Sequence, residues 1–247
     1  MERAYAAVHI EEDRRHWYFR GRLAMLLTAL ERTLPAAPCR VLELGCGTGN
    51  VLQALGRFGD AVGVERDPEL RAVGAAAGLD IRAGALPDDV PVPGGWADAV
   101  LLLDVIEHFD DDVAALRAAR EAVRPGGLVM VTVPAYAWLW SGHDVALGHR
   151  RRYTARRLRT VIDAADLRVE RLSYFNAVLF PAIAAARLAK RVLGRSSHDL
   201  HRPSPFVNEI LTRLFALERH VALRPGLPFG SSLLAIARRA ARARADA

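Results

Sequence analysis

The stretch V-L-E-L-G-C-G-T-G-N, running from Val41 to Asn50, decides how this chain folds. Its first four residues are typical of a buried strand, and three glycines follow within five positions. Glycine loses more conformational freedom on folding than any other residue, so such clusters mark a tight turn or a backbone that a ligand approaches. The candidate ligands are a dinucleotide, a nucleotide phosphate or another adenosine-bearing cofactor.

The spacing of the glycines separates these candidates. Gly45, Gly47 and Gly49 follow the pattern G-x-G-x-G, whereas a dinucleotide fingerprint reads G-x-G-x-x-G. A phosphate-binding Walker loop requires a lysine, and this stretch has none. Glu43 lies inside the strand, two residues before the first glycine. Both phosphate-bearing ligands are therefore disfavoured.

The composition is that of an ordinary globular protein. The chain has 247 residues, 51% hydrophobic and 25% charged, which fits a single elaborated domain. The net charge is +6, and Lys190 is the only lysine, so the basic balance is an arginine bias and does not by itself indicate a nucleic-acid partner. The two cysteines are too few for a disulfide framework, and the longest uncharged apolar stretch, 172–186, is too short to span a bilayer. We expect a soluble, cytoplasmic protein.

Apolar runs alternate with amphipathic stretches, as in successive βα units. This alternation predicts a doubly wound α/β sheet, whose ligands bind beyond the carboxyl ends of the strands. The predicted strands are 40–44, 61–65, 79–83, 97–104, 127–134, 167–174 and 231–238, the last returning antiparallel.

We divide the chain into four parts of one domain: an N-terminal helical lid (1–39), an α/β core (40–174), a helical cap insertion (175–230) and a last strand with its tail (231–247). A packing appendage is an equal alternative to the cap, and core burial of Trp17, Tyr18 and Phe19 is a close rival to the lid. The second helix of the insertion is predicted to bury two rows of apolar side chains. These are Phe206, Ile210 and Leu214 on one row and Val207, Leu211 and Phe215 on the next.

Further motifs follow in register. Glu65 ends the second strand, L-L-L-D-V-I-E-H-F follows the fourth (101–109), and R-P-G-G precedes the fifth (124–127). Together with E-x-G-x-G-x-G, these motifs resemble the class I S-adenosylmethionine-dependent methyltransferases. The segments 11–23 and 141–154 are similar to a bacterial small-molecule branch labelled type 11 or 12. The resemblance implies a Rossmann-like, seven-stranded sheet with one antiparallel strand, and methyl transfer from S-adenosylmethionine to a small-molecule acceptor.

The cofactor is a sulfonium cation with a zwitterionic amino acid end, so its site needs carboxylates and carbonyls. Glu65 is expected to accept hydrogen bonds from both ribose hydroxyls. Ala85 stands where the family often has an adenine-binding acid, so the backbone of Ala85 and Leu86 is placed beside the adenine, with Asp88 as a displaced substitute. The predicted cofactor-binding residues are Glu43, Gly45, Cys46, Gly47, Gly49, Glu65, Arg66, Ala85, Leu86, Asp104 and Val105.

Methyl transfer is an in-line displacement at carbon, and a histidine serves as general base where the acceptor must lose a proton. The predicted catalytic residues are His108, His143, His149 and Tyr153. Asp144 is available to orient one imidazole. We predict no metal, because the spacing H-D-x4-H matches no established site and no third strong ligand is evident.

The arginines of 150–159 form, on our interpretation, a mostly solvated helix face, with Arg151 or Arg152 pointing inward. An NAD-dependent oxidoreductase and a non-catalytic cofactor-binding module remain the alternative functions. A nucleic-acid substrate is disfavoured, since D-V-I-E-H-F is not a base-flipping motif. Peripheral contact with a membrane is compatible with the basic, alanine-rich insertion.

Overall fold

The computed structural model describes residues 12–36, 38–192, 203–221 and 226–241. The chain forms two compact units. The helical unit comprises the described residues of Met1–Thr33, Val133–Ala155 and Ser173–Leu233, and the sheet unit those of Leu34–Thr132, Arg156–Leu172 and Leu234–Ala247. Parts of the predicted lid (1–11), insertion (193–202 and 222–225) and tail (242–247) lie outside the described residues. The division into four parts of one domain stays a prediction.

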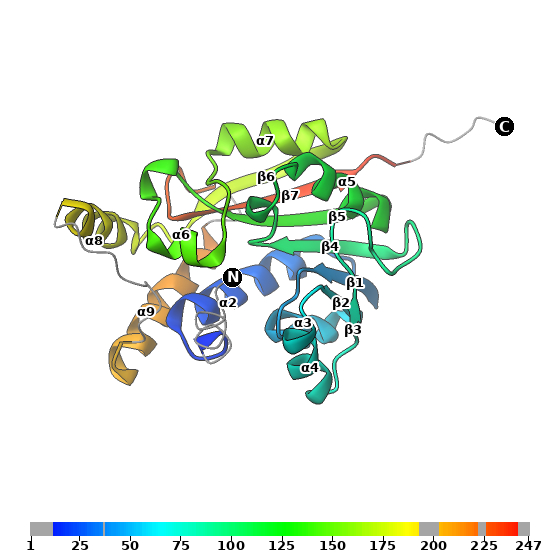
Figure 1. Ribbon diagram of the computed structural model, residues 1–247, viewed down its shortest axis with the longest axis horizontal. Coiled ribbons are helices and arrows are strands. Elements are labelled where there is room, and N and C mark those ends of the chain that lie inside the picture. Colours follow the sequence, from blue (N-terminus) through cyan, green and yellow to red (C-terminus); the bar gives the residue numbers. More distant parts are fainter. Residues whose placement is uncertain (1–11, 37, 193–202, 222–225, 242–247) are drawn as a thin grey trace. The chain divides into compact units, whose positions relative to one another are not determined.

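A seven-stranded sheet has the order β3-β2-β1-β4-β5-β7-β6 (Figure 1). β1 pairs in parallel with β2 and β4, β2 with β3, and β4 with β5, while β7 is the antiparallel strand. The strands are β1 (Cys39–Leu44), β2 (Gly59–Glu65), β3 (Ile81–Ala83), β4 (Ala97–Leu103), β5 (Val123–Pro134), β6 (Leu167–Phe175) and β7 (Ser232–Arg239). The predicted Rossmann-like fold class is confirmed.

Continuous apolar runs place β1 and β4 at the centre of the sheet. Val41, Leu42, Leu101 and Leu102 are fully buried, as expected for parallel strands covered on both faces. The predicted strand bounds agree within two residues, except for β5, which begins at Val123 and takes in the R-P-G-G motif. A register irregularity in the pairing of β4 with β5 accommodates this early start.

Helices follow the parallel strands, as the alternation predicts. They are α3 (Asn50–Leu55), α4 (Pro68–Ala76), α5 (Asp112–Ala122) and α7 (Ala155–Ala164), with short 3-10 turns η1 (Gly56–Phe58) and η2 (Ile106–His108). The start of α4 shows how sequence fixes these bounds: the Asp67 carboxylate accepts from the backbone N–H groups of Glu69 and Leu70, and Pro68 fills the first helical position.

The helical unit contains α2 (Trp17–Thr33), α6 (Gly142–Leu147), α8 (Phe180–Val192) and α9 (Pro205–Leu217), with the turns η3 (Ala137–Leu139) and η4 (Glu218–His220). α2 and α9 lie side by side (Figure 1). Gly21 permits this approach, because a Cβ there would stand 2.5 Å from Phe215 Cδ1. No helix of the described residues is both long enough and apolar enough to cross a membrane.

The predicted burial of α9 is wrong for four of its six apolar residues. Phe206, Val207, Ile210 and Leu214 are exposed, Leu211 is half-buried and Phe215 is fully buried. The side of α9 that packs inward carries Asn208, Thr212 and Phe215. The Asn208 side chain accepts from Trp17 N at 2.9 Å and donates to Arg15 O at 2.9 Å, so polar groups hold α9 to the N-terminal segment.

Candidate active site

The glycine turn after β1 has the backbone that its sequence predicts. Gly45, Gly47 and Gly49 have φ values of 71°, 57° and 78°, in the left-handed region that favours glycine. A Cβ at Gly45 would stand 2.8 Å from Val105 Cγ2, and one at Gly49 2.5 Å from Leu79 Cδ1. At Gly47 a Cβ would meet nothing within 4 Å. Two of the glycines thus allow close packing, and the middle one leaves open space.

Glu65 lies at the end of β2 and faces this turn. Its Oε2 accepts from Gly47 N at 3.0 Å, and its Oε1 accepts from Asp67 N at 2.9 Å. Each carboxylate oxygen has two acceptor positions, so hydrogen bonds from two ligand hydroxyls are chemically compatible with these contacts. The residue is 9% exposed. The carboxylate both fixes the turn and offers acceptors beside its open middle glycine.

The turn is electrically negative. Burial raises the pKa of the Cys46 thiol, and the charges of Glu43 and Glu65 raise it further. Cys46 is therefore a neutral thiol at the turn, and its predicted contact with the cofactor stays a prediction. Glu43 is buried within β1, next to the turn in sequence. Two carboxylates acting on one side chain make a site suited to a cation and unfavourable to a pyrophosphate.

Asp104 and Val105 follow the carboxyl end of β4. Asp104 has φ 59°, a strained value for a residue with a side chain, and its Oδ1 accepts from Thr132 Oγ1 at 3.1 Å. Val105 is buried and packs toward Gly45. The structure thus brings this segment to the glycine turn, and its contact with the methionine portion stays a prediction.

The residues predicted near the adenine lie in a loop after β3. Ala85 and Asp89 exchange two backbone hydrogen bonds of 2.8 Å, with Leu86 in the intervening turn. Asp88 is exposed. Arg66 is also exposed, and its carbonyl accepts from Arg71 Nη1. The contacts of these residues neither bear out nor contradict their predicted roles.

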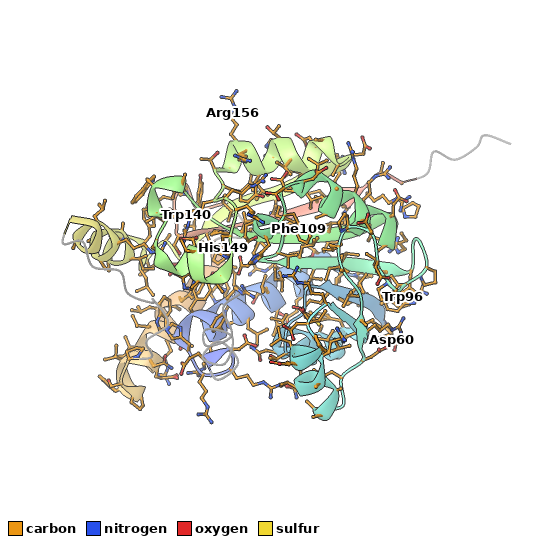
Figure 2. The ribbon with its side chains drawn as sticks, viewed as in Figure 1. Asp60, Trp96, Phe109, Trp140, His149 and Arg156 are labelled. Atoms are coloured by element: carbon orange, nitrogen blue, oxygen red, sulfur yellow. The ribbon has the colours of Figure 1, made fainter. Side chains whose placement is uncertain are left out.

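In the helical unit, His149 is held by Asp144, as predicted. His149 Nδ1 lies 2.9 Å from Asp144 Oδ1, and the imidazole is 5% exposed. His149 follows α6, the helix that carries Asp144 (Figure 2). In the tautomer that donates Nδ1–H to the carboxylate, Nε2 keeps its lone pair and can accept a proton.

A buried guanidinium fixes Asp144 in turn. Arg152 donates from Nε to Oδ1 at 2.7 Å and from Nη2 to Oδ2 at 2.9 Å, and Ser141 N donates to Oδ2 at 2.9 Å. Burial by itself would raise the pKa of Asp144, but the His149 hydrogen bond and the Arg152 charge hold it well below its usual range. The inward orientation predicted for Arg151 or Arg152 is confirmed for Arg152, whereas Arg156 extends from α7 into solvent (Figure 2).

The other predicted catalytic residues differ in their environments. The His143 and His149 rings meet edge to face, with centroids 6.4 Å apart. His108 lies in η2 of the sheet unit and is half-buried. Tyr153 is fully buried, and its backbone bonds to Pro134 and Tyr136. Its burial gives the predicted catalytic role of Tyr153 no support.

Sequence reasoning missed an aromatic cluster in the helical unit. Tyr136 stacks on Tyr174 at 5.1 Å and on Trp138 at 5.8 Å, and Phe180 lies against Tyr136 and Trp138. Burial, and then the hydrogen bond with Tyr174, raise the pKa of Tyr136, so its hydroxyl stays protonated. Trp138 is 43% exposed. The available sequence signal was the position of Tyr136, two residues beyond the end of the predicted strand 127–134, and the structure gives this residue a positive φ of 56°.

Comparisons with known sequences identify relatives that are named as methyltransferases. The family model described as methyltransferase domain matches residues 12–172. A ubiquinone biosynthesis O-methyltransferase of Cereibacter sphaeroides is 34% identical over 108 residues, which are 41% of this chain and 43% of that protein. An uncharacterized methyltransferase of Mycobacterium bovis is 32% identical over 141 residues, 53% of this chain and 51% of that protein. The chain spans about half or less of the length of these curated relatives.

Solved structures share the fold at low identity. The complex of the Haloferax volcanii Trm112 methyltransferase activator with a methyltransferase matches with a TM-score of 0.65 and 20% identity, over 97% of this chain and 96% of that chain. An S-adenosylmethionine-dependent methyltransferase of Thermotoga maritima matches with a TM-score of 0.61 and 17% identity, over 95% and 98%.

The described residues fit S-adenosylmethionine. Gly47 leaves open the space that a Cβ would fill, Glu65 offers acceptors beside it, and Glu43 adds negative charge for a cationic cofactor. With the family model covering residues 12–172, these features lead to one assignment. The chain belongs to the methyltransferase domain family and has the class I fold that uses S-adenosylmethionine as its cofactor.

Proposed function

We propose that this protein transfers a methyl group from S-adenosylmethionine to a small-molecule acceptor. The observation that carries the proposal is the Glu65 carboxylate at the end of β2, bonded at 3.0 Å to the N–H of the open glycine. In the sheet unit, Glu65 and the glycine turn would hold the ribose and amino acid portions. When bound, the cofactor supplies an electrophilic methyl group on a sulfonium.

His149 is the proposed general base. Asp144 accepts from Nδ1, so the imidazole is held in the tautomer whose Nε2 can take a proton. The acceptor's O–H, N–H or acidic C–H would give its proton to Nε2 as the acceptor atom gains the methyl group. Arg152 neutralises Asp144 and fixes its position, which makes it a positioning residue. A buried and oriented imidazole supports this role more strongly than any feature of His143.

The aromatic cluster of Tyr136, Trp138, Tyr174 and Phe180 is the proposed contact for a planar acceptor. Stacked and tilted rings with partial exposure offer a surface on which another ring can stack. One curated relative is named for O-methylation in ubiquinone biosynthesis, which is consistent with an aromatic acceptor.

An NAD-dependent oxidoreductase is the alternative, and the site disfavours it. The negative charges of Glu43 and Glu65 act on Cys46 in the glycine turn, where a pyrophosphate would lie in a dinucleotide-binding protein. Isothermal titration of the protein with S-adenosylmethionine and with NAD separates these functions. We expect binding of the former only, and methyl transfer from labelled cofactor into phenolic or catechol acceptors. NAD binding without S-adenosylmethionine binding would overturn the proposal.

A further inference from the structure

Exposed apolar side chains concentrate in one segment of the helical unit. Among the described residues, twelve large hydrophobic side chains are exposed, and nine of them lie between Val178 and Phe229. Isolated exposed apolar residues are common on protein surfaces, whereas contiguous exposed apolar patches mark interaction sites, so the question is whether these side chains share one surface.

The polarity of α9 is inverted relative to an ordinary surface helix. Phe206, Ile210, Leu214 and Leu217 follow one another at spacings of four, four and three, which places them on one side of the helix. Phe206 is 76% exposed and Leu217 61%. We call this side, with Val207, the apolar stripe. The opposite side carries the buried polar residues Asn208 and Thr212.

Packing within the unit holds the apolar stripe outward. Asn208 bonds to the backbone of Trp17 and Arg15, and Arg20 Nη1 pairs with Glu209 at 2.9 Å. Phe215, on the inward side, stacks on Phe175 with ring centroids 6.0 Å apart. Turning the apolar stripe inward would break these contacts, so its exposure is a property of the folded unit.

The same segment is basic. Residues 175–230 contain eight arginines and lysines against three acidic residues, a net charge of +5 out of +6 for the whole chain. Arg213 borders the apolar stripe with a side chain that is 79% exposed. Its pairing with Glu209 is exposed too, and such pairs contribute little and exchange readily with other anions.

We propose that the apolar stripe docks α9 onto an anionic lipid bilayer surface. A helix with an apolar side that also carries an exposed cation, here Arg213, lies in the interface, its apolar side chains inserted and its cation against the headgroups. At 13 residues, α9 is about 20 Å long, too short to span the hydrocarbon core. A second copy is a poorer occupant, because a symmetric contact would bring two segments of charge +5 together.

Vesicle flotation of the full chain tests this proposal. We expect the protein to float with vesicles of phosphatidylcholine mixed with phosphatidylglycerol, not with phosphatidylcholine alone, and to be released at high salt. The triple substitution Phe206→Gln, Ile210→Gln, Leu214→Gln should lower binding at least about tenfold. The matched control is Val73→Gln on α4 of the sheet unit, where the replaced side chain is 40% exposed. It should bind vesicles like the wild type.

The triple variant keeps the buried side of α9, so its melting temperature should match that of the wild type. Unchanged flotation of this variant, or a wild-type protein that does not bind anionic vesicles, would overturn the proposal. So would a concentration-dependent dimer in ultracentrifugation that the triple substitution abolishes while flotation is unaffected. Titration with S-adenosylmethionine checks the same samples separately, since vesicle binding does not require the cofactor.

Discussion

The end of β2 beside the glycine turn and the helix α6 each contain a buried carboxylate, Glu65 and Asp144, and the two are held in different ways. Glu65 is bonded by backbone N–H groups of Gly47 and Asp67, which are neutral donors. Asp144 is bonded by the guanidinium of Arg152 and the imidazole of His149. A carboxylate held by neutral donors keeps its charge for a ligand, whereas one paired with arginine is already compensated. We therefore assign ligand binding to Glu65 and positioning to Asp144.

The largest expected effect tests the positioning role. Asp144→Asn leaves a buried guanidinium without its charged partner, and breaking such a pair costs about 4 kcal/mol. Equilibrium urea unfolding measures this loss of stability. Glu65→Gln, the matched change in the other carboxylate, should lose less than half as much, because its donors are neutral. Equal losses would remove the contrast between the two regions.

The same contrast gives a pH dependence. The folded-state pKa of Asp144 is lowered, so its contribution to stability is complete above the ordinary value of 3.8 and is lost as the pH falls through the folded-state pKa. The stability difference between wild type and Asp144→Asn should therefore be constant near neutral pH and shrink below about pH 4. If the difference in unfolding free energy between wild type and Asp144→Asn grew on acidification, Asp144 would not be stabilised as an ionised partner of Arg152.

The next effect concerns the proposed base. His149→Ala should lower turnover about a hundredfold or more while leaving S-adenosylmethionine affinity nearly unchanged, since general-base catalysis contributes at least that much. His143→Ala, in α6, is the control for losing a neighbouring imidazole, and a smaller loss of turnover is expected. Normal turnover in both variants would refute the assignment of the base to either histidine.

Glu65→Ala probes the ligand role of the first carboxylate. The substitution removes the charged carboxylate that is proposed to accept hydrogen bonds from the ribose hydroxyls. We expect it to weaken S-adenosylmethionine binding about thirtyfold in titration calorimetry. Asp60→Ala, at the exposed amino end of the same strand, should bind like the wild type. If both variants bound the cofactor equally well, Glu65 would be a purely structural residue of the turn.

The smallest expected effects are the stability losses of alanine substitutions at Gly47 and Gly49, which should differ from each other. Gly47→Ala meets no neighbour, so it should cost only about 1 kcal/mol of backbone strain yet weaken cofactor binding. Gly49→Ala would set its methyl group 2.5 Å from Leu79 Cδ1, so it should lose more stability. Thermal unfolding and titration on both variants distinguish the effects. If Gly47→Ala lost more stability than Gly49→Ala, the space next to Gly47 would not be open to a Cβ.

The sequence by itself determined where the strands lie along the chain, the glycine turn, the acid at the end of β2 and the cap of α4. These features rest on interactions within a few residues: apolar runs, positive φ values and a carboxylate next to the first N–H groups of a helix. The family resemblance added the cofactor, and the match over residues 12–172 agrees with it. Local chemistry was sufficient for these features of the sheet unit, but it did not predict the early start of β5 at Val123.

Only the tertiary structure decided which side of α9 is buried. A hydropathy pattern shows that a helix has an apolar side, but the direction of that side depends on its partner. Here Asn208 bonds to the backbone near α2, 191 residues away, and turns Phe206 and Ile210 outward. The stacking of Tyr136 on Tyr174 likewise depends on how separate elements meet, because packing acts across space and leaves no local pattern in the chain.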